Sequence, residues 1–227
     1  MNQIDKNDVP AAAQLHEISH VSYVNSGGKG LRVLVVGNSI TLHEAKPEIG
    51  WYKSHGMAAS AKERDYVHLL IGKIAAAYPD AAFCIAQVAQ WEQQYANGSA
   101  LLIQYAAARD FGADVIVMRC IENCHNRTLD PMVLKREYSK LVDFLKSNPA
   151  AKVILTTGFW KHNGDGVIRA IGEERGYPVV ELGDLGELDE MKAIGLFEHK
   201  GVANHPGDKG MQVIADRIWE VIRNETI

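Results

Sequence analysis

Three polar residues stand at points of the chain where apolar runs end or a helical pattern begins, and together their side chains could transfer an acyl group. Ser39 follows Gly37 directly after an apolar run, and Asn123 follows a second run. His205 lies before Pro206, near the end of the chain. A serine hydroxyl becomes a nucleophile when a base takes its proton, and histidine is the base whose ordinary pKa suits neutral pH. An amide N–H can then stabilise the oxyanion that forms.

Each of these residues also has an ordinary structural interpretation when it is taken alone. Ser39 could cap a helix, Asn123 could be a turn residue and His205 could be a solvated loop residue. The turn after Gly37 would expose Ser39 at a strand end, and Pro206 would hold His205 in an extended conformation. One reaction needs all three side chains at one end of one sheet. Their combination therefore favours a Ser-His centre.

Apolar runs and helical patterns alternate along the chain and predict the elements that would position these residues. Five runs are typical of buried strands: Leu31–Val36, Ala82–Val88, Asp114–Met118, Lys152–Thr157 and Tyr177–Leu182. The helical patterns are Asp65–Tyr78, Ser99–Asp110, Pro131–Ser147, Gly164–Arg175 and Asp208–Arg223. The alternation predicts an α/β fold of three layers with a five-stranded, mostly parallel sheet of flavodoxin-like order. Ligands bind such sheets beyond the carboxyl ends of the strands.

The organisation along the chain is simple. Residues 1–30 are polar and end in a glycine-rich stretch, which predicts an N-terminal lead-in, and residues 31–227 are expected to form one domain. The 227 residues suit one hydrophobic core, with 47% apolar and 23% charged residues. We find no internal repeat or linker.

Charge and hydropathy exclude several classes of partner. The net charge is −4 and the pI is about 6.1, so neither nucleic acid nor an anionic membrane is expected as a partner. No run approaches the roughly 18 apolar residues that a membrane helix needs. The first twenty residues do not resemble a secretory signal, so a cytoplasmic location is expected unless such a signal has been removed.

Cysteine and histidine spacing predicts neither a disulfide framework nor a metal. Cys84, Cys120 and Cys124 are too few for a framework and are expected to be buried structural thiols in a reducing compartment. Cys120 and Cys124 with His125 lack the second ligand pair of a zinc motif. Three loop histidines also lack short ligand spacing: His43, His55 and His162. We expect no metal and no cofactor.

Three tryptophans lie in segments that are expected to flank the carboxyl ends of the strands. They are Trp51, Trp91 and Trp160. Aromatic faces stack on sugar rings and fill acyl pockets, which makes all three candidates for substrate binding. Each could equally be a core residue.

At these positions the sequence resembles the SGNH (GDSL-like) hydrolase superfamily. Residues 37–41 are similar to its first block, Asn123 to the asparagine of the third block, and His205 to the histidine of the fifth. The resemblance extends over roughly residues 31–223 and keeps the order of the blocks. It implies the SGNH fold, with Ser39 as nucleophile and His205 as general base. It also implies that the Ser39 backbone N–H and Asn123 stabilise the oxyanion.

The sequence departs from the family pattern at three places. Val202 stands where an aspartate usually precedes the histidine, so the triad acid is missing from its usual position. Glu198 is the nearest upstream candidate, with Glu187 and Asp189 as further ones. A Ser-His dyad steered by a backbone carbonyl, or an acid other than Glu198, is favoured slightly over Glu198. The glycine of the second block is not evident in residues 87–92. In the third block, Ile121 stands at the position of the family's glycine.

The expected activity is hydrolysis of a small acyl ester, most simply acetyl, on a carbohydrate or another small molecule. A long polar loop with Trp51 and His55 suits a sugar ester better than a long acyl chain. The alternatives are a lysophospholipase or thioesterase of the same fold, a non-catalytic carbohydrate-binding member, and a flavin- or nucleotide-binding protein. The flavin- or nucleotide-binding alternative is less favoured, because the sequence has no phosphate-binding loop after the first strand.

Overall fold

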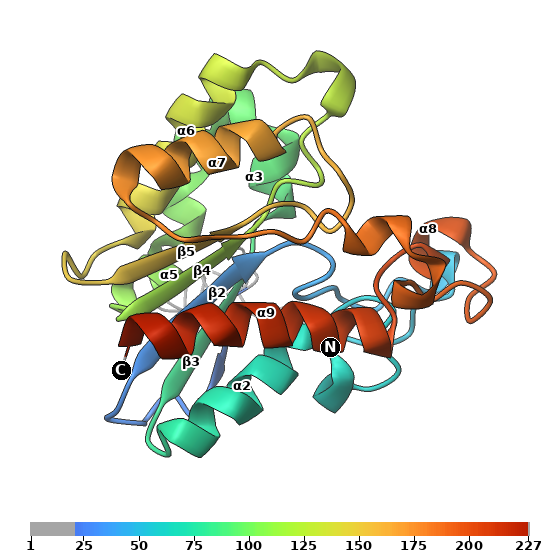
Figure 1. Ribbon diagram of the computed structural model, residues 1–227, viewed down its shortest axis with the longest axis horizontal. Helices are drawn as coiled ribbons and strands as arrows, with labels where there is room; N and C mark the ends of the chain where they lie inside the picture. Colours follow the sequence, from blue (N-terminus) through green and yellow to red (C-terminus); the bar gives the residue numbers. More distant parts are fainter. Residues whose placement is uncertain (1–20, 227) are drawn as a thin grey trace, which may run out of the picture.

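A six-stranded sheet runs through the middle of the molecule in the order β1-β3-β2-β4-β5-β6 (Figure 1). The computed structural model describes residues 21–226, so most of the predicted lead-in lies outside the described residues. The strands are β1 Val21–Val24, β2 Arg32–Gly37, β3 Ala82–Gln87, β4 Val115–Arg119, β5 Lys152–Thr156 and β6 Val179–Val180. The five predicted strands are all present and pair in parallel in the predicted flavodoxin-like order.

The prediction of five strands was wrong by one, because β1 adds an antiparallel edge strand. It pairs with β3, with Val21 opposite Ala86 and Val24 opposite Phe83. The segment has only four residues and lies within the stretch that was predicted as a lead-in. An edge strand this short is specified by its neighbour in the sheet more than by its own pattern.

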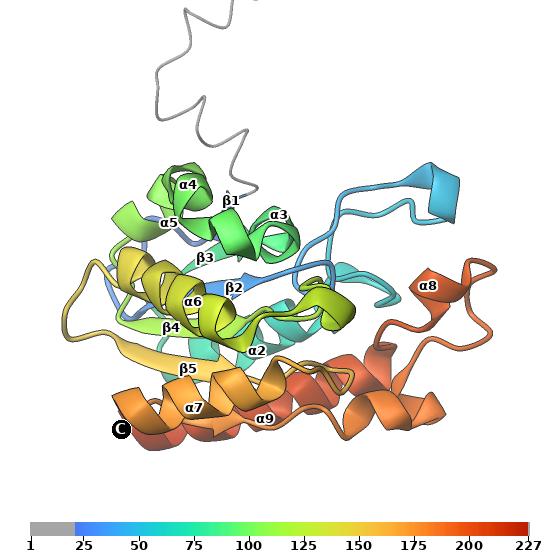
Figure 2. The same cartoon turned by 90° about the horizontal axis from the view of Figure 1, so that it is seen from above.

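Helices cover both faces of the sheet (Figures 1 and 2). One face carries α2 Tyr66–Ala77 and α9 Asp208–Thr226, and the other carries α3 Ala89–Gln93, α4 Gly98–Leu101, α5 Ala106–Asp110, α6 Pro131–Leu145 and α7 Asp165–Arg175. The short α8 Lys200–Ala203 lies beyond the carboxyl ends of the strands (Figure 2). The three-layer α/β prediction is confirmed.

Alternation along the strands divides the core into two halves. In β2, Val33 and Val35 pack toward α2 and α9, whereas Leu34 and Val36 pack toward the opposite layer. All four are at most 1% exposed. Because both faces of the central strands are covered, their sequences are almost continuously apolar.

Capping residues begin and end the helices near the predicted positions. Asp65 accepts a hydrogen bond from the His68 N–H at the start of α2, and Asp130 caps α6 ahead of Pro131. Gly176 ends α7 with a φ of +66°. The helical pattern predicted over residues 99–110 is divided in the structure, because a 3-10 segment, Leu102–Tyr105, separates α4 from α5.

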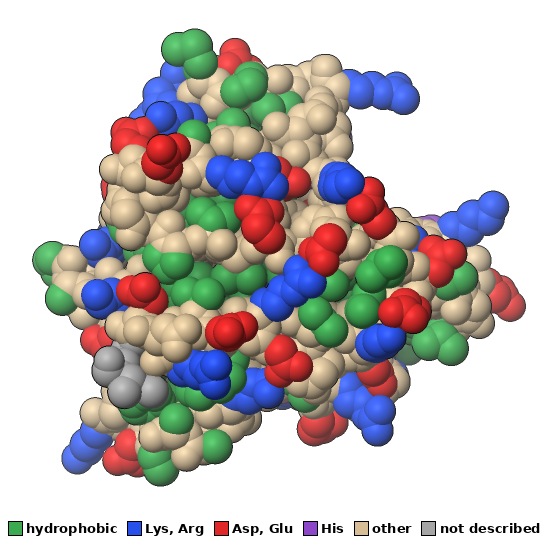
Figure 3. Space-filling model, in the orientation of Figure 1, with side chains coloured by type: hydrophobic (Ala, Val, Ile, Leu, Met, Phe, Trp, Pro, Cys, Tyr) green, Lys and Arg blue, Asp and Glu red, His purple; other side chains and the backbone are tan. Residues whose placement is uncertain are grey.

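Acidic and basic side chains are interspersed over the side of the molecule on which both α7 and α9 are visible (Figures 1 and 3). Several of them pair, for example Arg217 with Asp184 at 2.6 Å and Lys209 with Glu190 at 2.9 Å. No helix within residues 21–226 is both long and apolar enough to cross a membrane.

Candidate active site

A tight turn at the end of β2 presents Ser39. The N–H groups of Thr41 and Leu42 both bond the Asn38 carbonyl, at 2.9 and 3.0 Å. Gly37 is needed for this turn, because a Cβ there would overlap the Thr41 hydroxyl and lie 2.8 Å from the Arg119 carbonyl. The Ser39 N–H has no hydrogen-bond partner within residues 21–226, so it is available to a ligand.

His205 lies next to Ser39 although 166 residues separate them in the sequence. Its Nε2 is 2.9 Å from the Ser39 Oγ, and its Nδ1 is 2.7 Å from the Gly201 carbonyl oxygen. The ring of Trp160 packs edge-on against the imidazole, with centroids 5.3 Å apart. Pro206 forms an antiparallel bridge with Lys192, which anchors the loop just after the histidine.

The surroundings of the imidazole favour its neutral form. Burial lowers the pKa of His205 to about 4, while the Gly201 carbonyl and the Glu122 carboxylate act to raise it. A neutral ring whose Nδ1–H donates to a carbonyl leaves Nε2 free to accept a proton from Ser39. The pair therefore has the geometry and the protonation state of a nucleophile and its base.

The third position of a triad is taken by a backbone group. Val202, which replaces the usual aspartate, is 1% exposed and packs in a small apolar cluster with Trp51 and Met57. Glu198 lies on the surface, and it makes no hydrogen bond to His205 in the described part of the chain. The Gly201 carbonyl occupies the Nδ1 side of the ring instead.

Asn123 reaches the same pocket as Ser39 and His205. Its Nδ2 donates to the Glu92 Oε2 at 2.6 Å, and Glu92 is completely buried on α3. Burial, and after it the nearby Glu122 carboxylate, raises the pKa of Glu92, whereas the hydrogen bond from Asn123 acts in the opposite direction. The predicted oxyanion donor is therefore held by a buried carboxyl.

A buried arginine completes this polar cluster beneath Ser39. Arg119 is 0% exposed at the end of β4 and lies 2.7 Å from the Glu122 Oε1. Although burial acts to raise the pKa of Glu122, the Arg119 guanidinium holds it below its usual value. Asn38 joins the cluster by donating to both carboxylates and accepting from Arg119.

Sequence reasoning missed this cluster, namely Asn38, Glu92, Arg119 and Glu122, and also the role of the Gly201 carbonyl. One signal was present: Arg119 is a charged residue directly after a run of buried strand residues. A buried charge is retained only with partners, so its presence at a strand end pointed to a polar network.

A backbone N–H just after the end of β3 is a candidate for the oxyanion donor that was expected in the second block. Both Gln87, the last residue of β3, and Ala89, the first residue of α3, line the pocket of Ser39. The Ala89 N–H donates to the Gln87 side-chain oxygen at 3.0 Å. This N–H therefore faces an oxygen at the edge of the site.

The three tryptophans lie in different surroundings. Trp91 is 0% exposed and packs on Tyr138 in the core, and Trp51 is 1% exposed and packs on His55 and Phe197. Neither presents a ring face to a substrate. Only Trp160 is partly exposed at the site, where it contacts His205.

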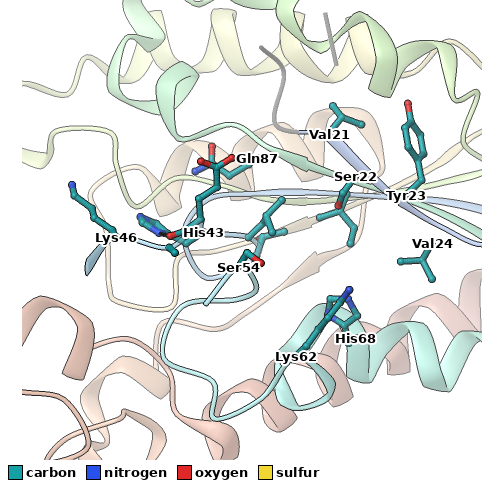
Figure 4. A pocket seen from close by; sticks show the side chains of 15 residues that line it. Val21, Ser22, Tyr23, Val24, His43, Lys46, Ser54, Lys62, His68 and Gln87 are labelled. Carbon is teal, nitrogen blue, oxygen red and sulfur yellow. Dashed lines mark hydrogen bonds between the residues drawn. The ribbon is translucent and has the colours of Figure 1, made fainter. Parts of the chain in front are cut away.

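Two hollows meet at the site. The smaller, of about 360 Å³, contains Ser39, Asn123 and His205. The larger, of about 770 Å³, extends from it toward β1 and the His68 side chain (Figure 4). His43 and Gln87 line both hollows, so the larger one continues the smaller along the edge of the sheet.

The described residues contain no group of three or more side chains arranged to hold a metal ion. Cys84, Cys120 and Cys124 are buried and unpaired. Burial raises the pKa of each of these thiols, which keeps them protonated.

Solved structures with a similar fold include esterases and lipolytic proteins. The esterase EstA from Pseudoalteromonas sp. has a TM-score of 0.58 at 14% identity over 85% of this chain and 97% of that chain. A two-domain esterase (CEX) active on acetylated mannans has a TM-score of 0.59 at 17% identity, over 88% of this chain and 50% of that chain. A putative lipolytic protein of the G-D-S-L family from Desulfitobacterium hafniense has a TM-score of 0.51 at 12% identity, over 84% and 98%.

No protein-family model matches the sequence, and no curated protein matches it either. At identities this low the likeness concerns the fold, which is that of the SGNH hydrolases.

Proposed function

We propose that this protein is a serine esterase that removes a small acyl group, most simply acetyl, from a carbohydrate. The single observation that carries the proposal is the 2.9 Å separation of the Ser39 Oγ and the His205 Nε2 at the carboxyl end of the sheet. A neutral imidazole within hydrogen-bond distance of a serine hydroxyl is the arrangement that activates this nucleophile.

In the first half of the reaction Ser39 is acylated. The Oγ attacks the ester carbonyl as its proton moves to the His205 Nε2, and the resulting oxyanion accepts hydrogen bonds from the Ser39 N–H and the Asn123 side chain. The Ala89 N–H supplies a third donor once the Gln87 side chain moves aside. Collapse of the intermediate breaks the ester C–O bond, and the leaving alcohol takes the proton from Nε2.

In the second half water replaces the alcohol. The Nε2 takes a proton from the water as its oxygen attacks the acyl carbon, and the same donors hold the second oxyanion. Collapse releases the acid and returns the proton to Ser39. Throughout, the Gly201 carbonyl accepts the Nδ1–H at 2.7 Å, which fixes the tautomer and orients the ring in place of a triad acid.

The two hollows support the choice of substrate. The hollow around Ser39 has apolar walls from Ile49, Met57 and Val202 and suits a short acyl group. The adjoining larger hollow has hydroxyl, amide and amine side chains that can bond a sugar, including Ser22, Ser54, Lys46 and Gln87 (Figure 4). The similar fold of an esterase active on acetylated mannans supports the same choice.

The proposal is tested with p-nitrophenyl acetate and acetylated oligosaccharides. The protein should hydrolyse both, and Ser39→Ala should abolish turnover while changing the free energy of unfolding by less than about 1 kcal/mol. A fluorophosphonate should label Ser39. Labelling of another residue with Ser39 unmodified would show that the nucleophile is wrongly assigned.

The replacement of the usual aspartate by Val202 favours one competing function, a carbohydrate-binding protein without catalysis. That protein would bind oligosaccharides and leave both esters intact. Hydrolysis of p-nitrophenyl esters with long acyl chains in preference to acetate would instead indicate a lysophospholipase or thioesterase.

A further inference from the structure

Glu92 is a buried carboxyl that the proposed reaction does not use directly. It is 0% exposed on α3, and it does not line the hollow that contains Ser39. Placing a carboxylate in the interior costs free energy unless hydrogen bonds compensate it. The partners of Glu92 therefore indicate what its burial achieves.

The direction of each hydrogen bond in the cluster follows from Arg119. A guanidinium can only donate, and one of its N–H groups lies 2.5 Å from the Asn38 Oδ1. The Asn38 amide is thereby oriented with its nitrogen toward the carboxylates. That nitrogen donates to the Glu92 Oε1 at 3.0 Å and to the Glu122 Oε2 at 2.6 Å.

The second oxygen of Glu92 determines how Asn123 is oriented. The Glu92 Oε2 accepts from the Asn123 Nδ2 at 2.6 Å. If the Asn123 amide turned over, its oxygen would face a carboxylate oxygen and repel it. An amide nitrogen carries two hydrogens, so one remains for the hollow that Asn123 shares with Ser39.

We infer that Glu92 is a positioning residue for the oxyanion hole: its carboxylate holds the Asn123 amide so that a side-chain N–H, and not the carbonyl oxygen, faces the reacting carbonyl. The inference rests on the proposed esterase function. The chain of hydrogen bonds runs from Arg119 through Asn38 and Glu92 to Asn123, and while Glu92 is ionised each bond in it has only one possible direction. Glu92 acts through Asn123 and does not itself contact the substrate.

Glu92→Gln tests the inference, because glutamine has nearly the same shape but only one acceptor oxygen. Asn38 is fixed by Arg119 and takes that oxygen, so the glutamine nitrogen faces Asn123 and forces its amide to turn over. We expect kcat for p-nitrophenyl acetate to fall by about ten- to hundredfold, since losing one oxyanion donor costs about that much or more. KM should change by less than about twofold, because the donor acts in the transition state.

A double-mutant cycle separates positioning from a general structural role. In the Asn123→Ala background, Glu92→Gln should cause no further loss of kcat beyond about twofold. Glu137→Gln is the matched control, because Glu137 is 3% exposed on α6 and pairs with Arg136 and Lys140 outside the two hollows. Its kcat should stay within about twofold of the unmodified protein.

The outcomes that overturn the inference are an unchanged kcat in Glu92→Gln or equal losses in both backgrounds. NMR of the unmodified protein gives a measurement that does not depend on the folding of a variant. One Asn123 side-chain amide hydrogen, assigned with Asn123→Asp, should be shifted downfield and protected from exchange. Rapid exchange of both hydrogens would also overturn the inference. Failure of the unmodified protein to hydrolyse any ester would instead reject the proposed function.

Discussion

At the residue scale, the site combines an ordinary Ser-His contact with an unusual third partner. His205 is bonded at both ring nitrogens, to Ser39 at 2.9 Å and to the Gly201 carbonyl at 2.7 Å. A carbonyl orients the ring as a carboxylate would, but it carries no full charge to stabilise the imidazolium. Some compensating negative charge comes from Glu122, whose carboxylate acts to raise the pKa of His205.

The pH dependence of activity should reflect the desolvated imidazole. Because burial lowers the pKa of His205 to about 4, the ring stays neutral down to that pH and is lost as a base only below it. The acid limb of kcat/KM for p-nitrophenyl acetate should therefore have a midpoint near pH 4. The same midpoint is expected in Glu92→Gln. Because that variant has no carboxyl at position 92, this result would show that the limb does not report the ionisation of Glu92. A midpoint near 6.5 in both proteins would show that the ring is hydrated.

At the element scale, the turn between β2 and the following loop is the feature that presents Ser39, the proposed nucleophile. Gly37 is paired on both sides, with Gln87 of β3 and Arg119 of β4, and the chain leaves the sheet directly after it. The Thr41 side chain and the Arg119 carbonyl are so close that a Cβ at this position would overlap them. Ser39, which is partly exposed, therefore lies just beyond the end of the strand, where the turn begins.

Gly37→Ala should distort this turn. The added methyl group would overlap Thr41, and overpacking of this kind costs about 2 kcal/mol. We expect the free energy of unfolding, measured in urea, to fall by that amount and the esterase activity to fall with it. Gly166→Ala is the control, because Gly166 is exposed in α7 and a Cβ there meets nothing within 4 Å. It should be neutral or stabilising by up to about 1 kcal/mol. Equal effects of the two variants would contradict this account of the turn.

At the scale of the whole molecule, two segments far apart in the sequence meet beyond the carboxyl ends of the strands. One is the loop that carries Trp51, and the other is the segment from Met191 to Gly207 that carries Gly201 and His205 (Figure 2). Trp51 joins them by packing on Phe197 with ring centroids 6.1 Å apart, in a cluster with Val202.

Trp51→Ala should loosen the segment that holds His205. Truncation of a buried tryptophan costs about 3 to 5 kcal/mol, and we expect a loss of this size in urea unfolding. The kcat/KM should fall for p-nitrophenyl acetate and for acetylated oligosaccharides alike. Tyr52→Ala is the control, because Tyr52 is 72% exposed and its loss should change stability by less than about 0.5 kcal/mol. A raised KM for oligosaccharides alone, with unchanged stability, would restore the prediction that Trp51 stacks on substrate.

The sequence by itself determined the elements whose patterns are local. The parallel strands are continuous apolar runs because both faces of the sheet are covered, and aspartate or glycine marks several helix ends. The sequence also predicted the turn at Gly37 and Ser39 and the extended conformation at His205 and Pro206. Each of these short motifs constrains its own backbone. The strand order followed from the alternation of strands and helices.

Only the tertiary structure decided what depends on contacts between distant segments. The edge strand β1 exists through its pairing with β3, and Trp51 and Trp91 are core residues because other segments cover them. The partner of the His205 Nδ1 is a carbonyl, which every residue possesses and no sequence pattern marks. Glu92 and Asn123 lie 31 positions apart, and their contact arises where α3 and the loop after β4 meet beneath Ser39. Such contacts follow from how the elements pack, because packing, and not local propensity, places buried polar groups together.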